Sequence, residues 1–575
     1  MLRRIFSYMK EYKKYAWLAL ICIGVEVVLE IMVPKLMADL IDTGVTNSDV
    51  PYIINKGIQM AVCAVAALIL GVGSARFSAL AGQGLGANIR KAEYEKLQSY
   101  SFSNIDHFSV SSLVTRLTSD VTNIQNAVST GMRPFGRSPV MLIFATTLAF
   151  KINSTLAMVF LVALPVLAVL LIIIIINVGP RYGRMQGAVD LVNRCIEENL
   201  TAVRVVKSYV RGDYEIEKFG HVNDNLKNES EKAFGIAVLN MPAMQFVMYS
   251  TILGILLIGG RLINSGQMMI GQLTSFLSYV LLILNSLMMM SNVFLLMTRS
   301  LASAERIMKV IDEPIDITDE NAKDIEVKKG EIEFNHVWFK YKDTAKEYVL
   351  SDVSFHINAG QTVGIIGQTG SSKTTLIQLI PRLYDASKGE IKIDGINVKE
   401  YPVRHLRDAI SVVLQKNTLF SGSLIDNLRW GDENATLDEI KEACSIACVD
   451  EFIDRLPGGL DAEMGQEGVN VSGGQKQRIC IARAILKKPK VLILDDSTSA
   501  VDTATEGKIR NALAKKLPDM TKIIIAQRIS SVRHADQIII MDGGRVDAIG
   551  THESLLKTNK IYQEIYESQK EGADL

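Results

Sequence analysis

The sequence predicts an α-helical membrane bundle of six spans fused to an α/β domain with a largely parallel sheet. Two observations carry this prediction. Apolar residues make up 48% of the 575 residues and charged residues 22%, and the two kinds are segregated along the chain. Long apolar runs alternate with polar stretches up to about residue 300, whereas short β-rich runs alternate with helical segments from residue 330 onward. A chain of this length is expected to contain at least two domains.

The first part contains six apolar runs that can serve as membrane spans, each of which needs roughly 20 residues. The charged loops set their orientation, because Lys and Arg concentrate at the N-terminus and in residues 90–137 and 181–232. The positive-inside rule places these segments in the cytoplasm. Both long loops have few Gly or Pro and helix-compatible apolar spacing, so we expect helical extensions of the spans into water. The six runs are Tyr15–Val33, Gly57–Ala81, Ser138–Phe150, Thr155–Val178, Met241–Leu262 and Ile270–Met297.

Composition argues against several other classes of protein. Lys and Arg together number 62, as do Asp and Glu, so a balanced charge gives no reason to expect nucleic-acid binding. The cysteines contain no CxxC pair, and Cys444 and Cys448 are spaced for one helix face, so we expect buried thiols rather than a metal or disulfide site. The first apolar run is long and lacks a small-residue cleavage site, so we do not expect a cleaved signal peptide.

The character of the sequence changes near residue 300. The acidic stretch Asp312–Asp324 contains Pro314 and is typical of a linker. We expect a transmembrane domain over residues 1–310, a linker over 311–329 and an α/β domain over 330–575. The expected strands, which alternate with helical segments, are Ile332–Phe334, Thr362–Ile366, Val491–Leu494, Lys522–Ala526 and Gln537–Met541.

A phosphate-binding loop is predicted directly after the strand that ends at Ile366. The segment Gly367–Thr374 reads GQTGSSKT and precedes a helix, which is the context that a Walker A loop requires. Its glycines let backbone amides surround the phosphates, Lys373 neutralises them, and the Thr374 hydroxyl ligates Mg²⁺. Ser372 stands where the pattern has Gly, which is acceptable if Ser372 is already helical, so ATP binding should survive with altered affinity. The predicted set is Gly367, Gln368, Thr369, Gly370, Ser371, Ser372, Lys373, Thr374 and Thr375.

Two further motifs complete the pattern of a nucleotide-hydrolysing domain. The apolar run Val491–Asp496 ends in two acids, and Asp495 is placed to hold the water shell of Mg²⁺, the Walker B role. Between the two Walker motifs lies Val471–Arg478, which reads VSGGQKQR. An SGGQ at this position is a highly specific signature.

With these motifs the chain resembles a bacterial ABC exporter half-transporter over essentially its whole length. The resemblance implies that Tyr341 stacks on adenine and that Gln415 contacts Mg²⁺ and the membrane domain. It also implies that the chain works as a dimer, in which the signature closes over the ATP bound to the opposite subunit. The signature residues in question are Ser472, Gly473, Gly474 and Gln475.

The same resemblance assigns roles to three connecting segments. Ser499–Asp502 matches the family's D-loop. Short coupling helices near Asn104–Val114 and Val205–Tyr214 would dock onto the ATP-binding domains and transmit their closure. The two predicted coupling helices can also be interpreted as amphipathic helices without a special function, and this alternative stays open.

Two departures from the family pattern fall on the hydrolytic machinery. The family has a glutamate general base after the Walker B aspartate, whereas this chain has Asp496, whose carboxylate is drawn back by about 1.5 Å. A displacement of that size can cost about 100-fold in rate. The switch histidine is replaced by Gln527, which hydrogen-bonds but carries no positive charge. The signature is intact apart from Val471 in place of Leu. Two changed residues in this chain's own ATP site, with the signature preserved, favour a dimer of two different chains with different roles in hydrolysis.

We therefore predict the degenerate-site subunit of a heterodimeric multidrug-type exporter in the cell membrane, with ATP and Mg²⁺ as cofactors. Its expected partners are a second ABC half-transporter, the lipid bilayer and a small hydrophobic substrate. One alternative is a homodimeric exporter or lipid flippase that hydrolyses slowly through Asp496. Another is an ATP-gated channel or regulatory subunit. An importer module is disfavoured, since common importers keep spans and cassette on separate chains.

Residues inside the spans predict a substrate cavity. Glu26 and Glu30 lie one helical turn apart in the first span, where carboxylates are costly and usually functional. Methionines offer a soft, adaptable lining in spans five and six. We expect a cavity that accepts varied hydrophobic molecules, including cations. The methionines are Met241, Met244, Met248 and Met288–Met290.

Overall fold

The computed structural model describes residues 2–320, 322–342, 344–496 and 501–571. It divides into two compact units, one formed by Met1–Gln98 with Val110–Asp312 and the other by Ser99–Ser109 with Glu313–Leu575. The strands described by the structure all belong to the second unit. A short piece of the first long loop thus belongs to the second unit, although it precedes most of the spans in sequence.

The first unit is built from long helices. Among the residues that the structure describes, six helical segments have the length and apolar composition to cross a membrane, which confirms the six predicted spans. The longest helix has 49 residues and measures about 74 Å, more than twice the thickness of a hydrocarbon core. Its helices are α1 (Leu2–Ser7), α2 (Lys13–Asp39), α3 (Val50–Gln98), α5 (Val110–Thr115), α6 (Val121–Ser129), α7 (Met132–Ile152), α8 (Ser154–Thr201), α9 (Val203–Ser208), α10 (Gly212–Ala237), α11 (Asn240–Asn264) and α12 (Ile270–Asp312).

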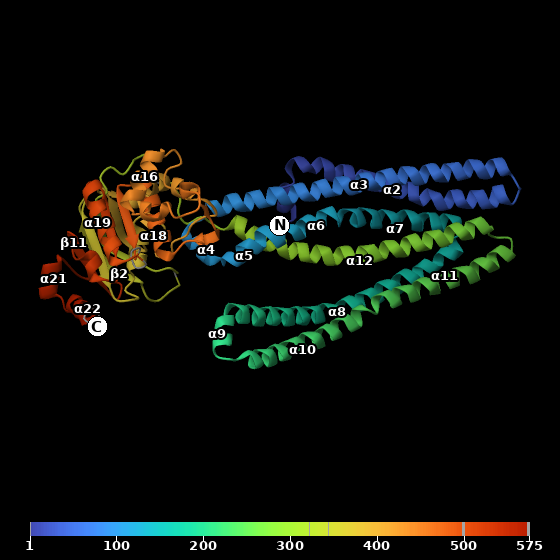
Figure 1. Cartoon of the computed structure of the whole chain (residues 1–575). Coiled ribbons are helices and arrows are strands. Elements are labelled where there is room, and N and C mark those ends of the chain that lie inside the picture. The colour runs from blue at the N-terminus through green and yellow to red at the C-terminus, as the bar shows by residue number, and fades with distance from the viewer. Residues whose placement is uncertain (1, 321, 343, 497–500, 572–575) are drawn as a thin grey trace. The chain divides into compact units, whose positions relative to one another are not determined.

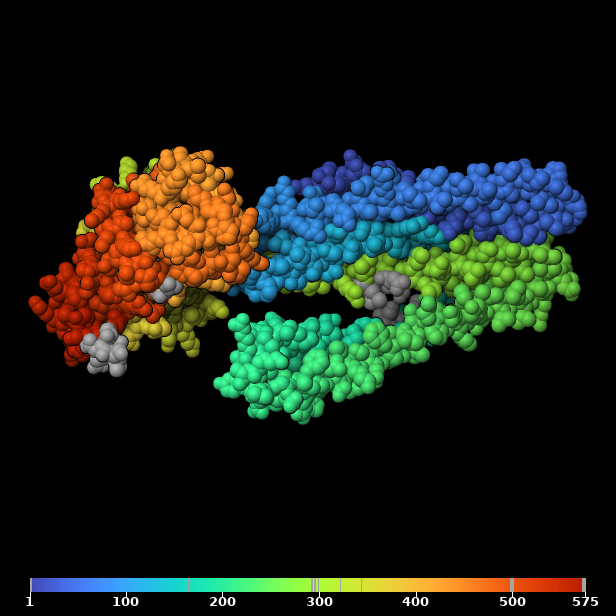
Figure 2. Space-filling model, viewed as in Figure 1, coloured from blue at the N-terminus to red at the C-terminus, as the bar shows by residue number. Residues whose placement is uncertain are grey.

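Helices α2, α7 and α12 enclose the apolar core of this unit, joined by parts of α8 and α11 (Figure 1). Phe160 and Phe276 stack with ring centroids 5.4 Å apart, and both are almost fully buried. The Tyr279 hydroxyl donates a hydrogen bond to the Ile31 carbonyl at 3.0 Å, which ties α12 to α2 and satisfies the polar end of a buried side chain. Helices α8 and α10, with α9 at their tip, form an arm that Figure 2 shows projecting from the other helices of the unit.

The second unit contains two main sheets. The larger has the order β12-β11-β3-β10-β9-β6, in which all pairs are parallel except β11 with β12. This confirms the largely parallel sheet. The smaller, antiparallel sheet β2-β1-β4-β5 was not predicted. The strands are β1 (Ile332–Phe339), β2 (Leu350–Ile357), β3 (Thr362–Gly367), β4 (Lys388–Ile393), β5 (Ile396–Asn397), β6 (Ile410–Val413), β7 (Gly422–Ser423), β8 (Glu463–Met464), β9 (Val491–Asp495), β10 (Thr521–Ile525), β11 (Gln537–Asp542) and β12 (Arg545–Gly550).

The parallel strands place several loops at one edge of the large sheet. Strands β3, β9 and β10 are adjacent and almost wholly buried, so they read as continuous apolar runs. Because their carboxyl ends meet at the same edge, the residues that follow them converge there. The helices of this unit are α4 (Phe102–His107), α13 (Lys373–Leu379), α14 (Val403–Asp408), α15 (Leu424–Arg429), α16 (Leu437–Ile446), α17 (Asp450–Ile453), α18 (Gly473–Leu486), α19 (Thr503–Lys516), α20 (Ile529–Val532), α21 (His552–Thr558) and α22 (Lys560–Glu571).

Candidate functional site

The loop between β3 and α13 has the form of a phosphate cradle. Gly367 has no room for a side chain, because a Cβ there would lie 2.2 Å from the Met541 carbonyl oxygen. Gly370 has a φ of +87°, which favours glycine. The Lys373 ammonium donates hydrogen bonds to the carbonyls of Gly367 and Gln368, both at 2.9 Å. The lysine is therefore held over the loop, although burial lowers its pKa against the opposing effect of nearby aspartates.

Ser372 is where the structure departs from the sequence expectation. We expected its side chain to be accommodated in a helical backbone, but Ser372 precedes α13 with φ 70° and ψ 24°, in the left-handed region. That conformation costs a residue with a Cβ about 1–2 kcal/mol. The physical reason is that the chain must turn sharply between the loop and the first turn of α13. The phosphate loop is consequently strained at the position where glycine is usual.

Asp495, at the end of β9, faces the start of α13. The Thr374 hydroxyl donates a hydrogen bond to its Oδ1 at 3.2 Å, while its buried Oδ2 has no hydrogen-bond partner. Burial raises the pKa of Asp495, and the Asp496 charge adds to this effect, whereas Thr374 and Lys373 oppose it. A buried carboxylate oxygen without a donor, beside a threonine hydroxyl, fits the hard oxygen ligands that Mg²⁺ prefers.

Asp496 and Gln527 contact each other directly. Gln527 follows β10, and its Nε2 donates a hydrogen bond to Asp496 Oδ2 at 2.7 Å. Burial raises the pKa of Asp496, and the hydrogen bond from Gln527 opposes that rise. Asp496 has a φ of 45°. The two positions that depart from the family pattern thus form one polar pair at the edge of the sheet.

Gln569, on the C-terminal helix α22, is a contributor that sequence reasoning missed. Its Nε2 donates to the Gln527 carbonyl at 2.7 Å, and its Oε1 accepts from the Ile529 amide at 2.9 Å. A single side chain therefore clamps the backbone on both sides of Arg528. Nothing in the local sequence indicates this contact, since it joins residues 42 positions apart.

Tyr341 and Gln415 occupy different parts of this domain. Tyr341 is 43% exposed, and its hydroxyl lies 2.9 Å from the Thr375 hydroxyl at the start of α13. This places an accessible aromatic ring beside the phosphate loop. Gln415 is exposed just after β6, the strand next to β9, so it belongs to the same edge of the sheet as Asp495.

The signature segment begins α18. Ser472 caps this helix by accepting a hydrogen bond from the Gln475 amide at 3.3 Å, and the Gln475 side chain accepts from the Ser472 amide at 2.9 Å. Ser472 and Gly473 are exposed. Among the described residues, no hydrogen bond joins the signature residues to the phosphate loop of the same chain. The predicted D-loop starts with Ser499 and Ala500, which lie outside the described residues.

Helix α4, from the first long loop, is part of the same compact unit. The Tyr384 hydroxyl donates to Asp106 Oδ2 at 2.7 Å, and the Asn104 side chain donates to the Pro314 carbonyl at 2.7 Å. Tyr384 in turn packs edge-on against Tyr341, with ring centroids 5.2 Å apart. A segment predicted to be a coupling helix therefore contacts a neighbour of the predicted adenine-stacking residue.

The fold and the site together define a membrane protein in which six spans are fused to an ATP-binding domain. Two family models match the chain, the ABC transporter transmembrane region over residues 16–287 and the ABC transporter domain over residues 350–499. An uncharacterized ABC transporter ATP-binding protein of Bacillus subtilis, YfiB, is 37% identical over 575 residues and the match covers all of both chains. The chain belongs to the ABC transporter family, as an exporter-type half-transporter that binds and hydrolyses ATP to drive export.

Two other relatives cover almost the whole chain. The ATP-dependent lipid A-core flippase of Pseudomonas putida is 32% identical over 576 residues, covering 98% of this chain and 95% of the flippase. The fold is similar to that of a bacterial Atm1-family ABC exporter solved with ATP bound, with a TM-score of 0.84 at 21% identity, covering 97% of this chain and 99% of the other. This chain is accordingly a multi-pass protein of the cell membrane that works with a second ABC half.

Proposed function

We propose that this chain is the subunit of a heterodimeric ABC exporter that carries a hydrolytically impaired ATP site. The pair formed by Asp496 and Gln527 is the observation that carries the proposal. A general base must reach the proton that it abstracts. Asp496 is one methylene shorter than the glutamate that the family pattern has, and its Oδ2 already accepts a hydrogen bond from Gln527 at 2.7 Å.

Gln527 cannot replace the function of the switch histidine. An amide offers a neutral donor, whereas histidine can carry a positive charge toward a γ-phosphate. One N–H of the Gln527 amide is already donated to Asp496, which leaves only the other as a neutral donor for a phosphate oxygen. Both losses thus act on the same step, the attack of water on ATP at this chain's own phosphate loop.

ATP binding at this site does not depend on those two positions. We propose that Tyr341 stacks on adenine, that residues 367–375 hold the phosphates, and that Thr374, Asp495 and Gln415 hold Mg²⁺. The orphaned Oδ2 of Asp495 supports the metal assignment. Magnesium, when bound, neutralises charge on the phosphates. The site should therefore retain ATP over many transport cycles.

The signature is proposed to complete the partner's ATP site. The amino end of α18 is exposed at Ser472 and Gly473, where the positive end of the helix dipole favours a phosphate. The capping box between Ser472 and Gln475 fixes the start of this helix. In this proposal the functional domains are residues 1–310 in the membrane, the linker 311–329 and the ATP-binding domain 330–575 in the cytoplasm.

A methionine-rich cavity supports the proposed export of hydrophobic compounds. A cavity of about 320 Å³ lies between α8, α11 and α12, with the amides of Gln245 and Asn285 as polar groups on its wall. Thioether side chains adapt to ligands of different shape. By contrast, the carboxylates of Glu26 and Glu30 are paired with arginines, so the cluster has no net negative charge with which to attract cations. The methionines of the cavity are Met241, Met244, Met248 and Met288.

The alternative is a homodimeric exporter or flippase that hydrolyses slowly through Asp496. The experiment is to purify the chain alone and together with a candidate partner half-transporter, and to measure ATPase activity and transport in liposomes. Our proposal predicts little turnover from the chain alone and vigorous turnover from the pair. Robust partner-independent turnover that Asp496→Ala abolishes would support the homodimer. Passive currents through bilayers, without transport, would indicate a channel.

A further inference from the structure

Four charged side chains meet in the middle of the membrane unit. Glu26 lies 13 residues from either end of α2 (Lys13–Asp39), about 20 Å from both. Arg133 Nη2 donates to Glu26 Oε1 at 2.7 Å, and Arg137 Nη1 does so at 3.3 Å. Arg137 Nη2 also lies 2.6 Å from the Glu30 carboxylate. Charges at such a depth are costly and are therefore candidates for function.

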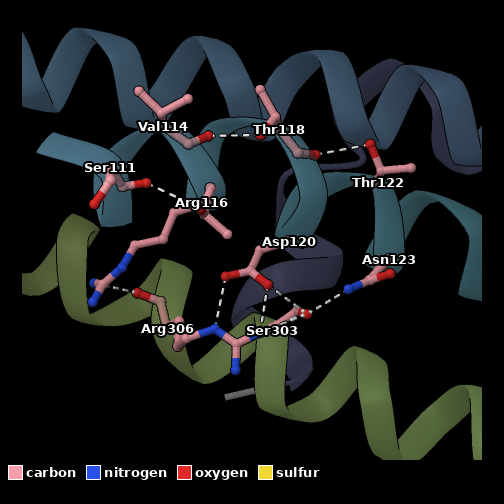
Figure 3. A network of polar contacts seen from close by, with 10 residues as sticks. Ser111, Val114, Arg116, Thr118, Asp120, Thr122, Asn123, Ser303 and Arg306 are labelled. Carbon is pink, nitrogen blue, oxygen red and sulfur yellow. Dashed lines mark hydrogen bonds and ion pairs between the residues drawn. The ribbon is translucent and has the colours of Figure 1, made fainter. Parts of the chain in front are cut away.

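This cluster differs from an ion pair elsewhere in the same unit in which both carboxylate oxygens are hydrogen-bonded. Figure 3 shows Asp120 between Ser303 and Arg306 of α12. Both carboxylate oxygens of Asp120 accept hydrogen bonds from these two side chains, and Asp120 is 2% exposed. That network closes on itself and needs no further partner.

The Glu26 cluster does not close on itself. Glu26 is only 5% exposed, yet its Oε2 has no hydrogen-bond partner. The side chains of Arg133 and Glu30 keep 40% and 32% of their surface exposed. Burying a polar atom without a partner destabilises the folded chain, and a ligand or a change of partner can recover that cost.

A cavity of about 420 Å³ adjoins the open side of the cluster. We call it the α2–α3 cavity. Its charged end is formed by Glu26, Glu30 and Arg133, and its wall by small and aliphatic side chains of α3. Gly71 brings the α3 backbone close, since a Cβ there would lie 3.2 Å from both Glu26 Oε1 and Arg133 Nη2. The wall residues are Ala64, Ala67, Leu68, Gly71, Val72 and Ala75.

The charges limit the ligand that this cavity can accept. Two carboxylates and two guanidinium groups sum to zero, so a ligand with a net charge would bring an uncompensated charge into an apolar region. A neutral ligand without charged groups would leave the exposed parts of Arg133 and Glu30 unmatched. A zwitterion with separate cationic and anionic groups matches both.

We propose that the α2–α3 cavity binds the head group of a zwitterionic amphiphile that carries an ammonium and a phosphate group. The phosphate lies toward Arg133, the ammonium toward Glu26 and Glu30, and the hydrocarbon part along the α3 wall. This site rests on the proposed export of hydrophobic compounds and deepens it by naming a head-group chemistry. It depends neither on ATP hydrolysis nor on asymmetry between two ATP sites.

The test measures equilibrium binding to the purified full-length transporter in an uncharged maltoside detergent, without nucleotide. The probes are phosphatidylethanolamine labelled on an acyl chain, phosphatidylglycerol labelled in the same way, and dodecylamine. We expect phosphatidylethanolamine to bind at least about tenfold more tightly than the other two, as loss of one charge-assisted contact implies. Equal affinity for all three probes, or no binding of the first, would overturn the proposal.

Two variants locate the binding on the transporter. Ala64→Trp fills the cavity from an exposed position on α3 and leaves the four charges unchanged, while Arg133→Gln removes the phosphate contact. Each should weaken phosphatidylethanolamine binding about tenfold. Val65→Trp, at the next exposed position of α3 but outside the cavity, is the matched control and should bind like the wild type. If both tryptophan variants bind equally well, the proposed site is wrong.

A folding defect would be distinguished by thermal unfolding of each variant in the same detergent. Because Ala64 is exposed, Ala64→Trp should keep the wild-type melting temperature and so remains informative if Arg133→Gln unfolds. The outcome is also separate from the proposed heterodimer. If the two ATP sites hydrolysed ATP at similar rates, binding of phosphatidylethanolamine would be unchanged. If phosphatidylethanolamine did not bind, the proposal of an impaired ATP site at Asp496 and Gln527 would still stand.

Discussion

The buried carboxylate of Asp495 lowers the unfolding free energy of the nucleotide-free chain. Its Oδ2 is buried without a partner, and burial raises its pKa above the value in the unfolded chain. A raised carboxyl pKa means that the folded state is penalised once the group ionises. Asp495→Asn should therefore stabilise the nucleotide-free protein by about 1 kcal/mol at neutral pH and abolish the extra stability that Mg-ATP confers. Thermal unfolding with and without Mg-ATP measures both effects.

The sign of the pH dependence follows from the same shift. Below the unfolded pKa of about 3.9 both states hold the proton, so ionisation of Asp495 should cause no difference in stability between wild type and Asp495→Asn. The advantage of the variant should grow as pH rises through the folded pKa and then level off. An advantage that shrinks with rising pH would contradict the account. Asp502→Asn, at a carboxyl whose pKa is lowered by the Thr505 amide, should show the opposite trend and serves as the control.

Ser372 carries backbone strain that a substitution can remove. Because it adopts φ 70° beside the phosphate loop, Ser372→Gly should relieve the left-handed penalty while adding the entropy cost of glycine in the unfolded chain. The net expectation is a gain of about 0.5–1 kcal/mol in unfolding free energy, with tighter ATP binding. Denaturant unfolding and nucleotide titration measure the two. Gly370→Ser, at φ +87°, is the reverse control and should destabilise the protein.

At the level of elements, α22 acts as a clamp on the loop that carries Gln527. Gln569→Ala removes two hydrogen bonds, one to the Gln527 carbonyl and one from the Ile529 amide. We expect hydrogen exchange at the Ile529 amide to become about five- to tenfold faster, since each bond contributes about 1 kcal/mol. Gln563→Ala, on the same helix, removes a hydrogen bond to the Leu556 carbonyl and should not change exchange at Ile529. Equal exchange in both variants would rule out the clamp.

Some elements could be predicted from sequence because their signals are local. The phosphate loop and the end of β9 carry motifs of fixed spacing, and the spans are marked by continuous apolar runs. The antiparallel sheet was missed apart from the start of β1, because strand β2 (Leu350–Ile357) alternates buried and exposed residues over a short run that periodicity alone does not separate from a loop. The polar extensions were predicted to continue the spans as helices, and α3 (Val50–Gln98) confirms this with 49 residues.

Pairings between distant residues could not be predicted from this one sequence. Glu26 was recognised as a costly intramembrane carboxylate, but its partner Arg133 lies 107 residues away, in a stretch whose basic residues were assigned to a cytoplasmic loop. The Gln569 contact has the same character. The backbone angle at Ser372 depends on how β3 and α13 are joined in space. Such features follow from packing, which sequence patterns determine only indirectly.

For the molecule as a whole, we propose that the two ATP sites of the transporter have different tasks. We propose that this chain binds ATP at a site weakened at Asp496 and Gln527, and that it lends its signature at Ser472–Gln475 to its partner. The partner should then carry glutamate and histidine at the positions equivalent to Asp496 and Gln527. Removing that glutamate should abolish nearly all turnover, whereas Asp496→Ala should cost little.

The most direct measurement identifies the nucleotide at this chain's own site during turnover. The purified pair is supplied with radiolabelled 8-azido-ATP and Mg²⁺, cross-linked by light at intervals, and separated into its two chains before the bound nucleotide is analysed. The account predicts that this chain retains ATP over many turnovers of its partner, with or without Asp496→Ala. Rapid conversion to ADP on this chain, slowed by Asp496→Ala, would contradict it.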